Sequence, residues 1–282
     1  MIEGILPQTY GRDEQAHCLM MFEWTKPINS SIQKFVENSF SKFNSFPMVG
    51  TGHNKNANSH GSYNRVKKRL YGFLDDKDES EKFDIRIRDK NPESTNGFFP
   101  CNVEFVANNS DTHPKQAQIS VSETVLGNPV DIVDLLMEDL LNEFGVFCGG
   151  CWSFPSHYGP ASYLSSIEAI PQGEAWGKNK PYAERITRWR NNVWRKNFNP
   201  SSGYFREIYP TNFLLPSHLK MPFRNKTLSS YLDSHGQIST VVNSNKMFRW
   251  DLTNDELDNV RHDLEDSGLI LSSETQPIIR AQ

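Results

Sequence analysis

Three short segments in the first half of the chain alternate apolar and polar residues, and this alternation restricts the possible folds most strongly. The segments are Phe83-Asp-Ile-Arg-Ile-Arg88, Cys101-Asn-Val-Glu-Phe105 and Ile119-Ser-Val-Ser122. Alternation with a period of two is typical of β-strands that bury one face and leave the other half-exposed. Because the strands are short and turn-rich segments separate them, we predict an antiparallel sheet.

Two helical patterns offer an apolar face to such a sheet. The first runs to about Phe43, and Pro27 suits its first turn because proline needs no hydrogen-bond partner there. The second covers residues 131–144 and is the clearest helix in the chain. Its apolar residues are Ile132, Leu136, Leu140 and Phe144 on one face, with Val133, Met137 and Leu141 beside them.

Residues 17–24 and 146–154 complete the predicted order as further strands, which gives β-α-β-β-β-α-β. Residues 50–64 are rich in Gly, Asn, His and Ser, so we expect a loop there. For residues 66–74 the periodicity does not decide between a helix and a strand.

The last hundred residues carry a second set of patterns. Helical spacing of apolar residues begins at Tyr182, a strand is expected within residues 204–215, and a short helix within 227–234. A hairpin is expected around residues 243–245. Thr253 and Glu256 form a capping box that opens the last helix, which should end at Gly268.

Residues 158–177 are rich in Pro, Gly and Ser and mark a predicted boundary. We therefore expect an N-terminal α+β domain over residues 1–177 and a smaller C-terminal α/β part over residues 178–282. The predicted class is α+β, an antiparallel sheet with helices packed on one face and the C-terminal part packed against it.

Charge and composition narrow the range of functions. The chain has 30 basic and 34 acidic residues, and this net charge of −4 gives no general attraction to nucleic acid or to an anionic membrane. No apolar run approaches the roughly 20 residues of a membrane span. The first residues lack the basic and apolar regions of a signal peptide, so we expect a cytoplasmic protein with reduced thiols.

The densest group of reactive residue types is Cys148-Gly-Gly-Cys151, with His157 close behind. Two thiols at this spacing can begin a zinc site or a redox pair, and a zinc- or thiol-dependent enzyme at these three residues is one alternative. However, redox pairs usually open a helix, and a Gly-Gly step within a strand pattern differs from the turn of a zinc knuckle. The other interpretation is that both cysteines are small buried apolar residues on a strand.

Two charged stripes are candidates for binding a partner. The helix of residues 131–144 carries Asp131, Asp134 and Glu138 with no compensating base, which favours a basic partner. A later helix carries Arg185, Arg188 and Arg195. Tryptophans lie between these arginines, so Arg188, Trp189 and Trp194 also suit a nucleic-acid-binding accessory protein of a bacterial defence system.

The predicted order resembles that of the α+β immunity proteins of bacterial polymorphic-toxin and type VI secretion systems. The resemblance covers residues 15–180 and includes an aromatic-Gly step at Phe144-Gly145 and a Tyr158-Gly159 element. Such families tend to show Trp-Gly where this chain has Phe144-Gly145, and Trp176-Gly177 offers another match. The resemblance implies a non-catalytic protein without a cofactor that binds a cognate protein toxin. The two charged stripes would then be its contact surfaces.

Overall fold

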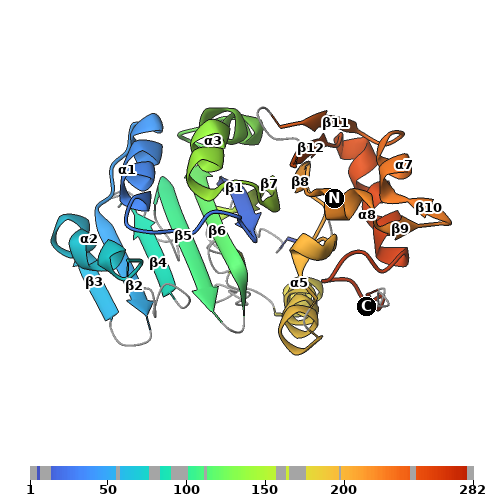
Figure 1. Ribbon diagram of the computed structural model, residues 1–282, viewed down its shortest axis with the longest axis horizontal. Helices are drawn as coiled ribbons and strands as arrows, with labels where there is room; N and C mark the ends of the chain where they lie inside the picture. Colours follow the sequence, from blue (N-terminus) through green and yellow to red (C-terminus); the bar gives the residue numbers. More distant parts are fainter. Residues whose placement is uncertain are drawn as a thin grey trace.

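A ten-stranded antiparallel sheet dominates the computed structural model (Figure 1). The structure describes residues 5–6, 14–54, 58–75, 83–89, 101–110, 113–156, 163–164, 176–196, 198–241 and 246–277. Across these residues the strand order is β11-β12-β8-β7-β1-β6-β5-β4-β2-β3. The strands are β1 (Gln15–Phe22), β2 (Val49–Asn54), β3 (Asn58–Ser62), β4 (Phe83–Arg88), β5 (Val103–Ser110), β6 (His113–Ser122), β7 (Cys148–Pro155), β8 (Thr211–Leu214), β11 (Gln237–Thr240) and β12 (Phe248–Asp251).

Seven helices of the described residues pack around this sheet, and a small ribbon of β9 (Pro222–Phe223) and β10 (Lys226–Thr227) lies beside it. The helices are α1 (Ile32–Lys42), α2 (Tyr63–Gly72), α3 (Pro129–Phe144), α5 (Trp176–Arg190), α6 (Pro216–Leu219), α7 (Leu228–Leu232) and α8 (Asn254–Asp266). A π-helical turn, Asn191–Arg195, continues α5. No helix of the described ranges combines the length and apolar character that crossing a membrane requires.

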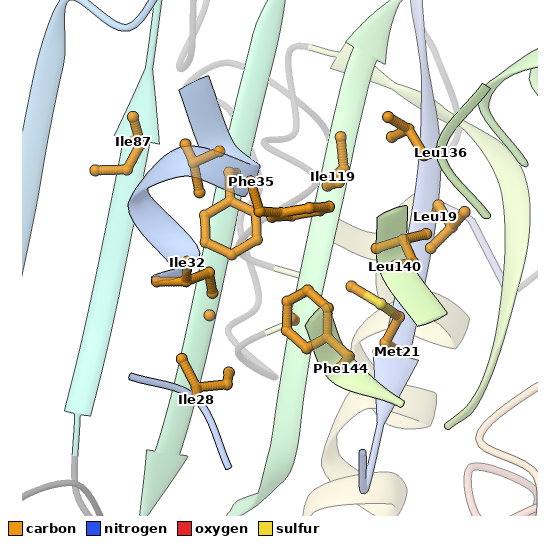
Figure 2. Close-up of a cluster of buried hydrophobic side chains, with 14 of the residues drawn as sticks. Leu19, Met21, Ile28, Ile32, Phe35, Ile87, Ile119, Leu136, Leu140 and Phe144 are labelled. Atoms are coloured by element: carbon orange, nitrogen blue, oxygen red, sulfur yellow. The ribbon is translucent and has the colours of Figure 1, made fainter. Parts of the chain in front are cut away.

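The two faces of the sheet bury two separate cores, because successive side chains of a strand point to opposite sides. In β1, Leu19 and Met21 face the core beneath α1, α2 and α3. Figure 2 shows side chains of α1 and α3, among them Phe35 and Phe144, directed at this face of the sheet. Their rings meet edge to face with centroids 5.4 Å apart. The alternate residue Met20 faces the other core, which contains the apolar residues of α5, α7 and α8.

The α+β class is confirmed. The predicted order β-α-β-β-β-α-β is incomplete, because β2, β3 and α2 lie between α1 and β4. Two details of that prediction are wrong. Helix α1 begins at Ile32, so Pro27 lies outside its first turn. Residues 50–64 are not a loop, because they contain β3 and parts of β2 and α2.

Glycines explain why the sequence of the β2–β3 hairpin lacks the alternation of apolar and polar residues that predicts a strand. Helix α2 packs so closely on β2 that a Cβ atom at Gly50 would lie 2.6 Å from Leu70 Cδ1, and one at Gly52 would lie 2.7 Å from Leu70 Cδ2. Gly50 and Gly52, which face α2, therefore have no apolar side chain, and the alternation that would have predicted strand β2 is missing from the sequence.

The C-terminal strands extend the same sheet. Strand β8 pairs with β7 through Gly149–Phe213, Gly150–Asn212 and Cys151–Thr211, and β12 and β11 follow outward. Strands from both sides of the predicted boundary at residue 177 therefore hydrogen-bond to each other. The division into two domains remains a prediction. Residues 158–162 and 165–175 of the boundary segment and the hairpin turn at 243–245 lie outside the described residues.

Candidate functional site

The two neighbouring cysteines lie on opposite faces of the sheet. Both belong to strand β7, where Cys148 joins the core beneath α5 and Cys151 joins the core beneath α3. Side chains three positions apart on a strand point in opposite directions, so the two sulfurs cannot bind one ion or form a redox pair. The alternative site at Cys148, Cys151 and His157 is wrong for this reason, although His157 itself lies outside the described residues.

Packing explains the Cys-Gly-Gly-Cys sequence. A Cβ atom at Gly149 would collide with the carbonyl oxygen of Met20 on β1, and one at Gly150 would collide with the Tyr209 ring. Burial raises the pKa of both thiols, so both stay protonated at neutral pH. The described ranges also contain no group of three or more His, Cys, Asp or Glu side chains placed to hold a metal ion.

The predicted basic stripe on α5 is largely internal. Arg185 exposes 14% of its side chain and pairs with two acids, Glu207 and Glu265, the second with an Nη1–Oε1 distance of 2.7 Å. Glu207 is buried and also accepts a hydrogen bond from the hydroxyl of Ser272. The assignment of Arg185 to a partner-binding surface is therefore wrong, because its charge is neutralised inside the protein.

The other residues of this stripe differ in their surroundings. Arg188 is half-buried and pairs with Glu184 and Glu274 at 3.1 and 2.7 Å. Trp189 is buried, and the guanidinium of Arg206 lies 5.0 Å from its ring centroid. Trp189 therefore cannot stack on a base as the nucleic-acid alternative requires. The side chains of Trp194 and Arg195 lie outside the described residues.

The predicted acidic stripe is on the surface. Helix α3 starts after Asn128, whose side chain accepts a hydrogen bond from the Val130 N–H at 3.0 Å. Asp131, Asp134 and Glu138 are all exposed. Asp134 pairs with Arg249 of β12, with 3.0 Å between Oδ1 and Nη1. For Glu138, no ion pair or side-chain hydrogen bond occurs among the described residues.

A groove of about 1020 Å³ opens between α3 and the β11–β12 hairpin. These elements are distant in sequence but lie side by side at the upper edge of Figure 1. Asp134 and Glu138 both line the groove, whereas Asp131 does not. The other lining residues are Thr25, Val133, Met137, Leu141, Asn142, Gly145, Val146, Ser239, Thr240, Val241, Lys246 and Arg249.

The groove has an apolar and a polar component. Met137 and Leu141 of α3 are partly buried against the core, and buried Val241 lies across from them. Partial burial favours the neutral form of Arg249, but hydrogen bonds and charges from Asp251 and Asp134 outweigh this effect and raise its pKa. Arg249 is therefore a fixed cation on the β12 side, while Glu138 is an acid on the α3 side. Such a surface can bind a partner through apolar contacts and ion pairs.

The sequence indicated the α3 side of this groove and missed the other side. Ser239, Lys246 and Arg249 come from a hairpin roughly a hundred residues later. The hairpin itself was predicted, but its position beside α3 depends on the pairing of β7 with β8 and of β8 with β12. No local pattern in the sequence encodes this proximity.

Comparison with known proteins adds no constraint on the function. No protein-family model, curated protein sequence or solved structure matches this chain.

Proposed function

We propose that this chain acts by binding, as an immunity-type protein that neutralises a protein toxin by covering it. The groove between α3 and the β11–β12 hairpin is the proposed contact surface. The observation that carries the proposal is that two of the acids expected to meet a partner, Asp134 and Glu138, line an apolar groove together. The predicted order β-α-β-β-β-α-β that suggested immunity proteins is interrupted by β2, β3 and α2, so the proposal depends on the groove.

The chemistry of the groove fits binding better than catalysis. Among its lining residues there is no His or Cys, the side chains that most often serve as general base or nucleophile. Arg249 is already engaged by Asp134 and Asp251. Glu138 is exposed and has no ion-pair partner within the part of the chain that the structure describes, and it lies beside apolar side chains. This is the pattern of an interface, in which charge steers a partner and apolar area retains it.

The test uses proteins encoded next to the gene for this chain. Each is purified singly and titrated against the chain, and each is expressed in cells with and without it. We expect one of them to arrest growth, to bind the chain tightly and to be neutralised by co-expression. If no neighbouring product binds and none is neutralised, the proposal is refuted.

Two variants locate the contact. Glu138→Lys reverses a charge on the α3 side, and Ser239→Arg places a long cation on the opposite side; both positions are exposed. Asp233→Lys is the matched control, because this exposed acid lies at the end of α7 and does not line the groove. Binding and growth rescue should weaken in the first two variants and persist in the control. Equal behaviour of all three would exclude the groove as the contact.

A further inference from the structure

We propose that helix α2 and the turn beside its first residue bind single-stranded nucleic acid, through phosphates and an unpaired base. This surface lies at the β3 end of the sheet, whereas the groove proposed to bind a toxin lies at the β11 end (Figure 1). It is a second site, and the inference does not depend on the proposed function.

The chain concentrates positive charge in one segment that contains no acid. Residues 38–74 contain six Lys or Arg residues and no Asp or Glu, although the whole chain has a net charge of −4. The rest of the chain therefore carries −10. Because salt screens charges over about 8 Å at physiological ionic strength, a phosphate responds to the cations beside it rather than to the net charge. A local attraction to polyanions is thus compatible with a net acidic chain.

Three cations of this segment are exposed together on α2. Lys68 and Arg69 follow Arg65 by three and four residues, so the three side chains are neighbours on the helix surface. None of them forms an ion pair among the described residues, whereas Lys67 pairs with Glu37 at 3.2 Å. The three cations are therefore available to phosphates.

The acids that follow α2 in the sequence begin beyond its C-terminal end. Asp75 comes after the last residue of α2, and its carboxylate accepts a hydrogen bond from the Ser30 N–H at 2.9 Å. Residues 76–82 lie outside the described residues. The proposed contact begins at the opposite end of the helix, with Arg65 in the first turn.

An exposed aromatic ring lies near this N-terminal end of α2. Phe46 is 68% exposed, and among the residues whose burial the structure describes no other aromatic side chain is exposed. Two residues later, the Met48 carbonyl accepts a hydrogen bond from the N–H of Tyr63, the first residue of α2, at 2.8 Å. This bond holds the turn beside the helix. Exposed rings next to cations bind single strands, because a base stacks on the ring while the cations attract its phosphates.

Polar side chains near the ring and the cations favour nucleic acid over a membrane. Ser62 and Asn64 are exposed on either side of Tyr63. Hydroxyl and amide groups hydrogen-bond to phosphate and sugar oxygens, whereas insertion into a bilayer would remove their water without replacing its hydrogen bonds. The ring also favours a single strand, because its unstacked bases are free to stack on a side chain.

The experiment measures binding of the whole chain to fluorescent oligothymidine and oligouridine by anisotropy at several salt concentrations. Oligonucleotides of about 12 residues fall within the usual site size for a single strand. We expect both to bind, because DNA and RNA share the phosphates and a stackable base, and we expect the duplex of oligothymidine with its complement to bind more weakly. Three phosphate contacts predict a slope of about −2 for log affinity against log salt. Phosphatidylserine–phosphatidylcholine vesicles serve as the anionic membrane.

Three variants separate the two kinds of contact. Lys68→Gln should lower the affinity and flatten the salt slope by about 0.7, because one phosphate contact is lost. Phe46→Ala should lower the affinity about fivefold to a hundredfold with an unchanged slope, because only stacking is lost. Lys220→Gln is the matched control and should change neither quantity, because this exposed lysine lies at the end of α6.

Four results from these measurements would each overturn the inference. They are no binding of either oligonucleotide at low salt, equal or tighter binding of the duplex, equal slopes for Lys68→Gln and Lys220→Gln, and an unchanged affinity of Phe46→Ala. Binding of the vesicles without the oligonucleotides would also overturn it and would identify a membrane-binding surface. Toxin neutralisation is measured separately, so either proposal can fail while the other stands.

Discussion

Replacing Arg185 by methionine should destabilise the fold strongly, although the sequence alone made this residue a candidate for binding a partner. In the structure, Arg185 Nε donates to Glu207 Oε1 at 2.8 Å, and only 2% of the Glu207 side chain is exposed. Removing the cation leaves the carboxylate with the Ser272 hydroxyl and with Arg261, whose Nε lies 3.9 Å away. Loss of one partner of a buried ion pair costs about 3–5 kcal/mol. Because Arg261 remains nearby, we expect about 3 kcal/mol.

Urea unfolding followed by tryptophan fluorescence measures this effect. A loss of about 3 kcal/mol lowers the folded-to-unfolded ratio by roughly two orders of magnitude. With an m-value of about 3 kcal/mol/M, the unfolding midpoint falls by about 1 M. Arg188→Met is the matched control on the same helix, because its partners Glu184 and Glu274 are 43% and 81% exposed. Ion pairs of this kind contribute about 0–1 kcal/mol.

A second substitution tests whether the unpaired charge of Glu207 causes the loss of stability in Arg185→Met. Adding Glu207→Gln to Arg185→Met removes the uncompensated charge, so the double variant should be more stable than Arg185→Met alone. If Arg185→Met unfolds at the same midpoint as Arg188→Met, the buried pair does not support the fold and the reasoning fails.

Three further predictions concern the fold. Thr253→Ala removes the side-chain cap of α8 and should lower the unfolding free energy by about 1 kcal/mol. Thermal melts should show this loss as a lower melting temperature. Hydrogen bonds from the Thr253 N–H and hydroxyl and from the Gly236 N–H lower the pKa of Glu256. The resulting stabilisation should be complete above the ordinary pKa of 4.5 and lost as the pH falls through the lowered value. Urea midpoints from pH 3 to 6 should therefore vary less in Glu256→Gln, and an unchanged pH profile would contradict this. Gly150→Ala should cost about 1–3 kcal/mol by steric overlap, whereas Gly127→Ala, with open space around it, should be nearly neutral in the same melts.

The sequence predicted those strands and helices well whose residue pattern depends on contacts between residues close together in the chain. Phe83, Ile85 and Ile87 alternate because one face of β4 is buried, and the strand has the predicted ends. The capping box of Thr253 and Glu256 forms as expected, because both partners lie within four residues. The β11 and β12 strands also pair on either side of residues 243–245, where a hairpin was predicted.

Features that depend on distant contacts could not be read from the sequence. Helical spacing placed Arg185 beside other basic residues, but it could not reveal Glu207 and Glu265 on later elements. The spacing of Cys148 and Cys151 suggested a shared site until the strand placed them on opposite faces. The groove also required knowledge of the strand order, because Arg249 reaches Asp134 only across the assembled sheet.

The central position of β1 has a consequence for how the chain is made. This strand lies between β6 and β7, and Phe22 at its end pairs with Cys148, 126 residues later. At a synthesis rate of about 5–20 residues per second, β1 waits roughly 6–25 s before that neighbour leaves the ribosome. Until β6 (His113–Ser122) has been made, the apolar segment Leu19-Met-Met-Phe22 has neither neighbouring strand, and until β7 follows it has only one. Newly made chains should therefore depend on chaperones that hold this segment until β7 has been synthesised.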